Sequence, residues 1–300
     1  MVKPRLAVFP KCFMDQLCVD HTMTLFEWIE LAATLGVDGL EFYSGFLPDD
    51  PVFLHQVKGA LESHQLAMPM LCCSPDFTQP DPVLLAEEIE REKRMIELTA
   101  FFGGRYCRVL SGQRRPGLDR AAGVAQVVGV IKDLLPFAEQ NGVVLTMENH
   151  YKDNYWEYPE FAQKMDVFIE IVDQIDSPWF GVNFDPSNTL LAGEEPLVLL
   201  ERVKDRVVTM HASDRFLKSG TIEDLRREEN AAGYAARLAH GVIGRGLNDY
   251  DAIFSVLRSV GFRSWISIED GVNGMDELRQ SASFLRSKID LHFPESQERQ

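Results

Sequence analysis

Short apolar runs alternate with longer segments of helical period along most of this chain, until eight pairs are counted. The apolar runs are rich in β-branched residues and are bounded by glycine, proline or polar residues, which is typical of buried strands. We expect strands at residues 5–9, 38–42, 67–72, 105–111, 142–148, 180–185, 206–212 and 264–269, each followed by a helix. Eight regular units favour an α/β fold of the closed (β/α)₈ TIM barrel type over an open doubly wound sheet.

Glycine and proline residues that typically end helices lie between the predicted units. The helical segment at 24–35 ends at Gly36, and Gly142, Pro178 and Gly261 separate later helices from the strands that follow them. With 300 residues, 45% of them hydrophobic, one domain can bury a large core. We therefore expect a single barrel over residues 1–293 and a polar tail over residues 294–300, which is expected to fray.

Two connections are longer than a barrel requires. Residues 149–160 carry four aromatic residues among charges, and residues 213–247 separate the seventh strand from its helix. Long loops at the C-terminal face of a barrel usually shape the substrate pocket. Within the second loop, residues 221–240 predict an inserted helix with a charged, solvated face. The aromatic loop could instead form an interface, because exposed aromatic residues are typical of both.

The charge balance excludes some classes of partner. The net charge of −16, from 46 acidic and 30 basic residues, repels polyphosphate backbones, so we expect no nucleic-acid partner. The first residues lack a long apolar segment with a cleavage site, and no later stretch has about 18 unbroken apolar residues. We expect no membrane partner and a cytoplasmic location. The five scattered cysteines fit reduced thiols in such a compartment.

Four polar residues stand at the ends of the last four expected strands: Glu148, Asp185, His211 and Glu269. An unpaired carboxylate after an apolar strand would cost several kcal/mol to bury, on the order of 2–7 for a polar group. Any one of the carboxylates could simply cap the next helix or pair with an arginine. Four such residues at equivalent positions on adjacent strands favour a shared divalent cation. Three carboxylates and one imidazole are suitable ligands for Mn²⁺, Mg²⁺, Co²⁺ or Zn²⁺.

His150 lies two residues beyond Glu148, so both side chains of an extended strand end would point into the barrel mouth. A histidine beside a metal site is suited to proton transfer near neutral pH, which makes His150 a candidate catalytic base. The alternative is a loop histidine bonded to the backbone. Glu148 and Glu269 are the other candidates for the base.

Five further residues are candidates for contacts to a substrate: Glu41, Arg108, Asn188, Asp214 and His240. Glu41 ends the second strand and would suit a polyol. Asn188 could bind a sugar hydroxyl or brace a ligand, and Asp214 could support the site or cap a helix. Arg108 and His240 could each contact an oxyanion or a hydroxyl, or be structural.

Motifs of other enzyme classes are missing from the sequence. The GRG pattern at 244–246 lacks the helix and the acidic residue of a dinucleotide fingerprint, and no GxSxG, P-loop or HExxH occurs. The commonest hydrolase, nucleotide-binding and zinc-protease assignments are thereby disfavoured.

The motifs GLEFY, TMENH, NFDPSN, MHASD and SIEDG together resemble the sugar isomerase and epimerase superfamily of xylose-isomerase-like barrels, over nearly the whole chain. The resemblance implies one divalent metal, commonly Mn²⁺, held by the four residues at the strand ends. Asn188 stands where ketose epimerases of the family usually carry histidine, and Ser213 stands where many relatives carry lysine. The ENH and DPSN motifs are similar to members that act on keto-sugars or 3-keto-glycosides, in which the histidine that matches His150 is thought to act as base.

The working hypothesis is a metal-dependent isomerase or epimerase of a sugar or keto-sugar, acting by proton abstraction α to a carbonyl through an enediolate. A lyase or dehydratase acting on a keto-sugar or 3-keto-glycoside is an alternative. Another is a non-catalytic, metal-stabilised barrel that serves as a partner subunit. A phosphodiesterase on the same barrel would need more histidines for its several zinc ions. A homo-oligomer is compatible with the sequence, but no pattern specifies its symmetry.

Overall fold

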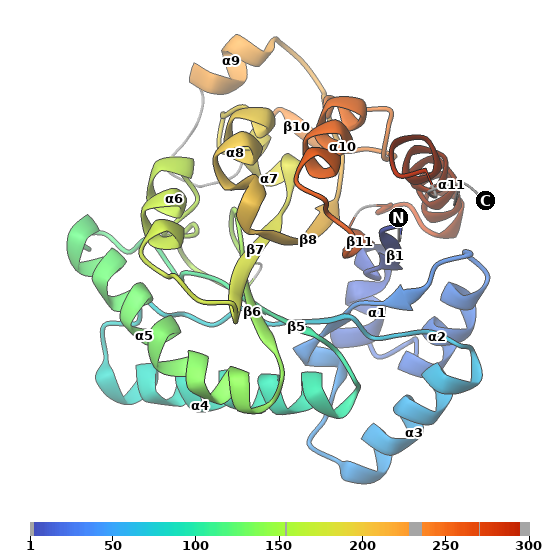
Figure 1. The fold of residues 1–300 in the computed structure, drawn as a ribbon, viewed down its shortest axis with the longest axis horizontal. Coiled ribbons are helices and arrows are strands. Elements are labelled where there is room, and N and C mark those ends of the chain that lie inside the picture. The colour runs from blue at the N-terminus through green and yellow to red at the C-terminus, as the bar shows by residue number, and fades with distance from the viewer. Residues whose placement is uncertain (1–2, 154, 228–235, 270, 295–300) are drawn as a thin grey trace, which may run out of the picture.

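Nine strand segments form one parallel sheet that curls into a barrel, with helices around it (Figure 1). The computed structural model describes residues 3–153, 155–227, 236–269 and 271–294. The barrel strands are β1 (Arg5–Val8), β2 (Gly39–Leu40), β3 (Phe42–Tyr43), β4 (Met70–Cys72), β5 (Tyr106–Val109), β6 (Val144–Glu148), β7 (Phe180–Phe184), β8 (Val207–Ala212) and β11 (Trp265–Ile268). Their order is β2-β1-β11-β8-β7-β6-β5-β4-β3. Because only Glu41 separates β2 from β3, these two segments act as one strand and close the ring, which confirms the predicted barrel.

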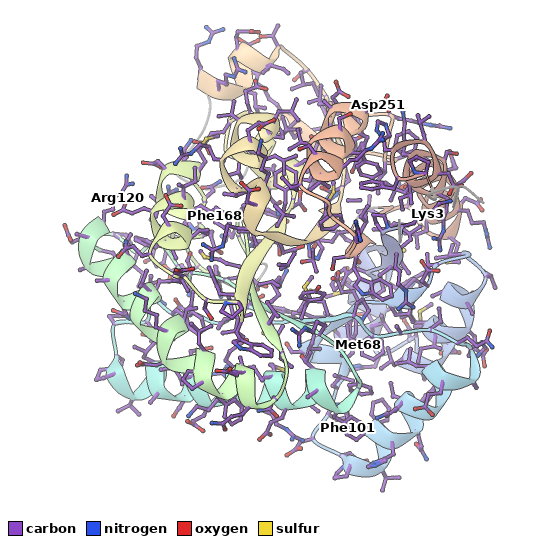
Figure 2. The ribbon with its side chains drawn as sticks, in the orientation of Figure 1. Lys3, Met68, Phe101, Arg120, Phe168 and Asp251 are labelled. Carbon is purple, nitrogen blue, oxygen red and sulfur yellow. The ribbon has the colours of Figure 1, made fainter. Side chains whose placement is uncertain are left out.

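Helices follow the strands, and the long ones form the outer layer, whereas the short helix Pro186–Leu191 is buried throughout. They are α1 (Met14–Cys18), α2 (Leu25–Ala33), α3 (Pro51–Ser63), α4 (Pro82–Phe101), α5 (Arg120–Gln140), α6 (Met165–Asp173), α7 (Pro186–Leu191), α8 (Pro196–Val203), α10 (Tyr250–Ser259) and α11 (Met275–His292). Short 3₁₀ turns lie at Lys11–Phe13, Ser44–Phe46 and Lys204–Arg206. In Figure 2, Arg120 lies at the outer edge of the molecule, whereas Phe168 of α6 is fully buried. The ends of the described chain are joined by an ion pair of 2.8 Å between Lys3 and Asp290.

Three helices begin at an aspartate followed by proline: α3 at Asp50, α4 at Asp81 and α7 at Asp185. In each case the carboxylate accepts backbone N–H groups of the first turn, and proline occupies the first helical position, where its missing N–H is not needed. The same local motif therefore starts all three helices, although only the third lies at the predicted metal site.

Helix α5 is the one described helix long and apolar enough, by length and composition, to cross a membrane. Its apolar residues Val124, Val127, Ile131 and Leu134 are at most 2% exposed and pack in the main core cluster with the barrel strands. Such burial is typical of the core-facing side of a barrel helix.

A layer of polar side chains lies inside the barrel beneath the predicted site. Four buried residues each stand two positions before a predicted metal ligand: Thr146, Asn183, Thr209 and Ser267. Alternate residues of a strand face the same side, so the predicted ligands project from that side one layer higher. The Thr209 hydroxyl donates to Asn183 Oδ1 at 2.9 Å, which ties β8 to β7 just below the site.

The structure corrects one predicted element. The helix expected over residues 221–240 is confirmed only at its start, where α9 spans Ile222–Arg227. Its end is wrong, because β10 (Leu238–His240) pairs antiparallel with β9 (Arg215–Leu217). Leu238 thereby joins a small buried cluster with Leu190, Leu191 and Leu225, so tertiary contacts override the helical propensity of the segment. Residues 228–235 of the expected helix and 295–300 of the expected tail lie outside the described residues. The eight expected strands are present, with ends displaced by at most three residues.

Candidate metal centre and active site

The four residues predicted from strand ends meet at the C-terminal face of the barrel. Glu148, Asp185, His211 and Glu269 each offer one oxygen or nitrogen atom, and these atoms lie within 4.8 Å of one another. All four side chains are buried, with at most 7% of the residue exposed. We call this group the quartet. Its members come from the ends of four neighbouring strands, so the parallel register of the barrel brings distant parts of the sequence together.

His211 is oriented by a carboxylate on the far side of its ring. Its Nε2 lies 2.9 Å from Glu41 Oε2, while its Nδ1 lies 3.1 Å from an oxygen of both Glu148 and Glu269. The protonated ring donates from Nε2 to Glu41 and from Nδ1 to Glu148, and loss of the proton on Nδ1 would leave its lone pair for a cation held by the quartet. Carboxylates in this position fix the ring orientation and raise the basicity of metal-binding histidines. Burial lowers the pKa of His211, but Glu41, Glu148 and Glu269 outweigh it and raise that pKa well above its usual value.

Asp185 combines two roles. Its Oδ1 accepts the backbone N–H groups of Ser187 at 2.7 Å and Asn188 at 3.1 Å, and so caps α7. The same oxygen accepts the hydroxyl of Ser213 at 2.7 Å. The helix-cap alternative raised by the sequence is therefore real, and it coexists with membership of the quartet. Three donors fix the side chain in place before any ligand is bound.

Glu148 is held by two donors from different elements. Arg108 of β5 donates from Nη1 to Glu148 Oε2 at 2.8 Å, and Asn188 of α7 donates from Nδ2 to Oε1 at 3.0 Å. Burial raises the pKa of Glu148, but His211 and Arg108 hold it below its usual value. Asn188 thus lies against a quartet member, and its predicted contact to substrate stays a prediction.

The pKa values of the other two quartet carboxylates depend on burial and on the charged side chains around them. Burial, then Glu269 and Glu148, raise the pKa of Asp185 from 3.8 to about 7. Burial also raises the pKa of Glu269, but Lys11, at 3.5 Å, and His211 bring it well below its usual value. Three carboxylates around one imidazole form a hard, anionic donor set that fits a divalent cation, with all four quartet residues available to hold it.

His150 lies in a cavity of about 420 Å³ beside the quartet, and Arg108, His240 and Glu269 line the same cavity. We call this cavity the cleft. The ring of His150 stacks on Tyr151 at 4.9 Å between centroids, and its Nδ1 lies 3.7 Å from Glu160 Oε2. Burial lowers the pKa of His150, but the interaction with Glu160 and the charge of Glu148 outweigh it and raise that pKa.

Asp214 is placed away from the cleft. Its carboxylate accepts the backbone N–H groups of Gly244 and Gly246 at 2.9 Å and of Asn248 at 3.2 Å. A Cβ at Gly246 would collide with Asp214 Oδ1, so the close approach requires glycine there. The GRG pattern of the sequence therefore forms a cradle for this carboxylate. A direct contact between Asp214 and substrate stays a prediction.

The residues at the site that were not predicted include Lys11, Tyr43 and Glu160. Lys11 lies just after β1, so the strand-end rule that found the quartet could have found it as well. Tyr43 ends β3 and follows Glu41 by two positions, which gives a similar signal. Glu160 carries no local signal, because its approach to His150 depends on the path of the loop from residue 149. Glu41, which was predicted, contacts His211 rather than lining the cleft.

Comparison with solved structures shows proteins of the same fold. A D-tagatose 3-epimerase-like protein superposes with a TM-score of 0.75 at 16% identity, covering 96% of this chain and 98% of that chain. The IOLI protein, solved with a zinc atom, has a TM-score of 0.74 at 18% identity, covering 97% and 99%. At these identities the likeness shows the fold.

Among curated proteins, 3-oxo-isoapionate decarboxylase of Pectobacterium atrosepticum is 29% identical over 133 residues, 44% of this chain and 41% of that protein. Inosose dehydratase of Bacillus thuringiensis is 22% identical over 162 residues, 51% of each chain. The matched segments thus span about half the length of these relatives or less. The model of the xylose isomerase-like TIM barrel family matches residues 29–288, and this chain belongs to that family.

Proposed function

We propose that this chain is a divalent-metal-dependent isomerase or epimerase of a sugar or keto-sugar. The observation that carries the proposal is the convergence of the quartet within 4.8 Å, next to a cleft that also holds His150. A divalent ion held by the quartet would supply Lewis-acid polarisation of the substrate carbonyl, which makes the neighbouring carbon more acidic. Mn²⁺ remains the predicted ion, with Mg²⁺, Co²⁺ and Zn²⁺ as the alternatives.

In the proposed reaction His150 removes the proton from the carbon next to the carbonyl. The electron pair of the C–H bond forms the enediolate, and the carbonyl oxygen takes the negative charge. Glu160 faces Nδ1 of His150 across 3.7 Å, so it would stabilise the protonated ring and leave Nε2 for the substrate. Arg108 and Lys11 supply positive charge at the cleft, where the negative charge develops.

The fate of the proton decides the product. Its return to the neighbouring carbon gives isomerisation, and its delivery to the opposite face of the original carbon gives epimerisation. Loss of a β-hydroxyl, which leaves as water with the proton, gives dehydration. This second candidate, a lyase acting on a keto-sugar, is supported by the dehydratase and decarboxylase names of the curated relatives. Both candidates share the first proton transfer.

The test is exchange of the substrate's α proton with deuterium from the solvent, measured by NMR on metal-loaded protein with a panel of keto-sugars. The His150→Ala variant should keep its metal and slow exchange by about 10²–10⁴-fold, the usual contribution of a general base. His64→Ala changes an exposed histidine at the end of α3 and should exchange like the wild type. Exchange in His150→Ala at the wild-type rate would remove His150 from this role. If metal-loaded wild type exchanges no keto-sugar proton, the proposed function is wrong.

A further inference from the structure

Asn149 lies between Glu148 of the quartet and His150 of the cleft, but its side chain is directed elsewhere. Alternate residues of an extended segment project to opposite sides, so Glu148 and His150 reach the barrel mouth while Asn149 is directed toward the segment that follows β7. Asn149 is only 4% exposed, and a buried amide requires hydrogen-bond partners. Its partners are Asp185 and Thr189.

The side-chain amide of Asn149 binds both backbone polar groups of Asp185. The N–H of Asp185 donates to Asn149 Oδ1 at 2.9 Å, and Asn149 Nδ2 donates to the carbonyl oxygen of Asp185 at 2.6 Å. The same Nδ2 donates to Thr189 Oγ1 at 3.2 Å. The pairing of β6 with β7 ends at Glu148 and Asn183. An asparagine amide has the donor and the acceptor of a backbone peptide group, so Asn149 extends the pairing of the two strands beyond their ends.

A second asparagine makes the reverse connection between the same two segments. Asn188, which follows β7, donates from Nδ2 to Glu148 Oε1 at the end of β6, at 3.0 Å. Asn149, which follows β6, holds Asp185 at the end of β7. Each of these two quartet residues is therefore held by an asparagine from the other segment. The two connections fix the ends of β6 and β7 relative to each other.

The contacts of Asn149 differ in kind from the other contacts of Asp185. Ser187, Asn188 and Ser213 donate to Oδ1 and orient the carboxylate. Asn149 binds the backbone on both sides of the Cα atom, so it fixes the position of the residue itself. Ionised carboxylates at short range repel each other, and a defined separation between two quartet carboxylates requires such support.

We propose that Asn149 is a positioning residue that sets the separation of Glu148 and Asp185, and thereby the affinity and the size selectivity of the metal centre. This inference rests on the proposed function, because it concerns the metal that the function requires. Selectivity between divalent ions of different size depends on the size and the flexibility of the site. A rigid pair of carboxylates favours the smaller Mn²⁺ over the larger Ca²⁺, so loss of Asn149 should reduce that preference.

The test is calorimetric titration of the chelator-treated full chain with Mn²⁺, and with Ca²⁺ in competition with Mn²⁺. Asn149→Ala removes three hydrogen bonds and should weaken Mn²⁺ binding by about 10–100-fold, the usual cost of losing a partner that orients a ligand. Ca²⁺ binding should weaken less. Asn141→Ala is the matched control, because Asn141 Nδ2 donates to the carbonyl oxygen of Phe137 at 2.9 Å, before the opposite end of β6. It should bind both ions like the wild type.

Thermal unfolding checks that the variants fold. If Asn149→Ala is unfolded, Thr189→Val replaces it, because this change removes one partner of the Asn149 amide with little change in volume and should also weaken Mn²⁺ binding.

Unchanged Mn²⁺ affinity in the folded variant would overturn the inference. Equal losses for Mn²⁺ and Ca²⁺, or a loss of the same size in Asn141→Ala, would overturn it as well, since either result indicates general support of the fold. So would a wild type that binds no Mn²⁺. The titrations contain no substrate, so they decide the role of Asn149 even if the metal-loaded wild type exchanges no keto-sugar proton and the proposed function fails.

Discussion

Among the residues that the structure describes, two of the buried clusters that combine carboxylates with sulfur or nitrogen side chains differ in their chemistry. In the quartet, three carboxylates converge around one imidazole, and the pKa of Asp185 rises to about 7 because burial and two acidic neighbours disfavour its ionisation. In the second cluster, Glu92 of α4 is flanked by Cys73 and Cys107.

The second cluster has donors for its carboxylate. The thiol of Cys73 donates to Glu92 Oε2 at 3.0 Å, and that of Cys107 donates to Oε1 at 3.3 Å. Each oxygen of Glu92 therefore has a partner, and the cluster can remain neutral when Glu92 is protonated. The comparison shows that burial and proximity alone do not identify a metal site. The quartet differs in its donor set, because three carboxylates and one imidazole converge beside the cleft, and this set suits a hard divalent cation.

The largest expected effect comes from removing one quartet charge. Asp185→Asn keeps a side-chain acceptor for the cap of α7 but loses an anionic metal ligand. We expect loss of bound metal and a decrease of about 10²–10³-fold or more in deuterium exchange, the cost of removing one strong electrostatic contact. Metal analysis of dialysed protein and NMR exchange measure the two effects.

Asp50→Asn is the matched control, because Asp50 caps α3 before a proline at the protein surface. It should bind metal and exchange protons like the wild type. If Asp185→Asn retains its metal, Asp185 acts only as a helix cap.

The next effect concerns Glu92. Burial raises the pKa of Glu92 from 4.5 to about 7, so its contribution to stability is fully present below about pH 4.5 and is lost as the pH rises through about 7. A shift of this size corresponds to about 3 kcal/mol. Glu92→Gln should flatten the fall in the free energy of unfolding between pH 5 and pH 8, measured by urea denaturation, and should leave the metal content unchanged. The exposed Glu90→Gln serves as control. A pH dependence shared by wild type and Glu92→Gln would show that Glu92 does not titrate there.

A smaller effect is expected from Asn188, which supports the quartet through one hydrogen bond to Glu148. Asn188→Leu should weaken metal binding by about 10–100-fold, the usual cost of losing a partner that orients a ligand. Asn188→Asp places a carboxylate against Glu148 and should not restore the affinity. Metal titration by calorimetry provides the affinities. Unchanged affinity in Asn188→Leu would leave only substrate contact as the role of this residue.

The smallest effect is on thermal stability. The raised pKa of Asp185 means that its ionisation destabilises the metal-free fold as the pH rises from about 4 to about 7. A bound cation offsets the repulsion between the carboxylates. The increase in Tm on adding metal should therefore be larger at pH 8 than at pH 5.5. Each kcal/mol of additional stabilisation by the metal corresponds to roughly 2–4 °C in Tm. Scanning calorimetry of metal-free and metal-loaded protein at both pH values measures it. An increase that is equal at the two pH values would contradict the coupling.

Much of the site could be predicted because strand ends can be recognised in the sequence, and a parallel barrel brings all of its strand ends to one face. Glu148 and Asp185 follow apolar runs, and the parallel register of a barrel carries such positions to one face regardless of their separation in the chain. The Asp-Pro motif at 185 did not distinguish a cap from a ligand, since Asp50 and Asp81 share it. Burial distinguishes them, and burial depends on the tertiary structure.

The parts of the site and fold that the sequence did not predict depend on the paths of loops and on tertiary packing. The approach of Glu160 to His150 and the pairing of β10 with β9 arise from contacts between segments that no periodicity connects. The end of the helix expected over residues 221–240 was wrong for this reason, because Leu238 is buried in a local cluster and its segment forms a strand, whereas α9 confirms the start of that helix. A cavity of about 550 Å³ likewise combines residues at the end of β4, from α4 and from the loop that begins at residue 149.

The most direct test of the account is equilibrium binding of Mn²⁺ to the chain after chelator treatment, measured by calorimetry near pH 7.5. The account predicts one ion per chain, with an affinity that falls by at least about 100-fold in His211→Ala, which removes the imidazole donor of the quartet. Failure of the wild type to bind a stoichiometric ion, or equal affinity in the wild type and His211→Ala, would contradict it.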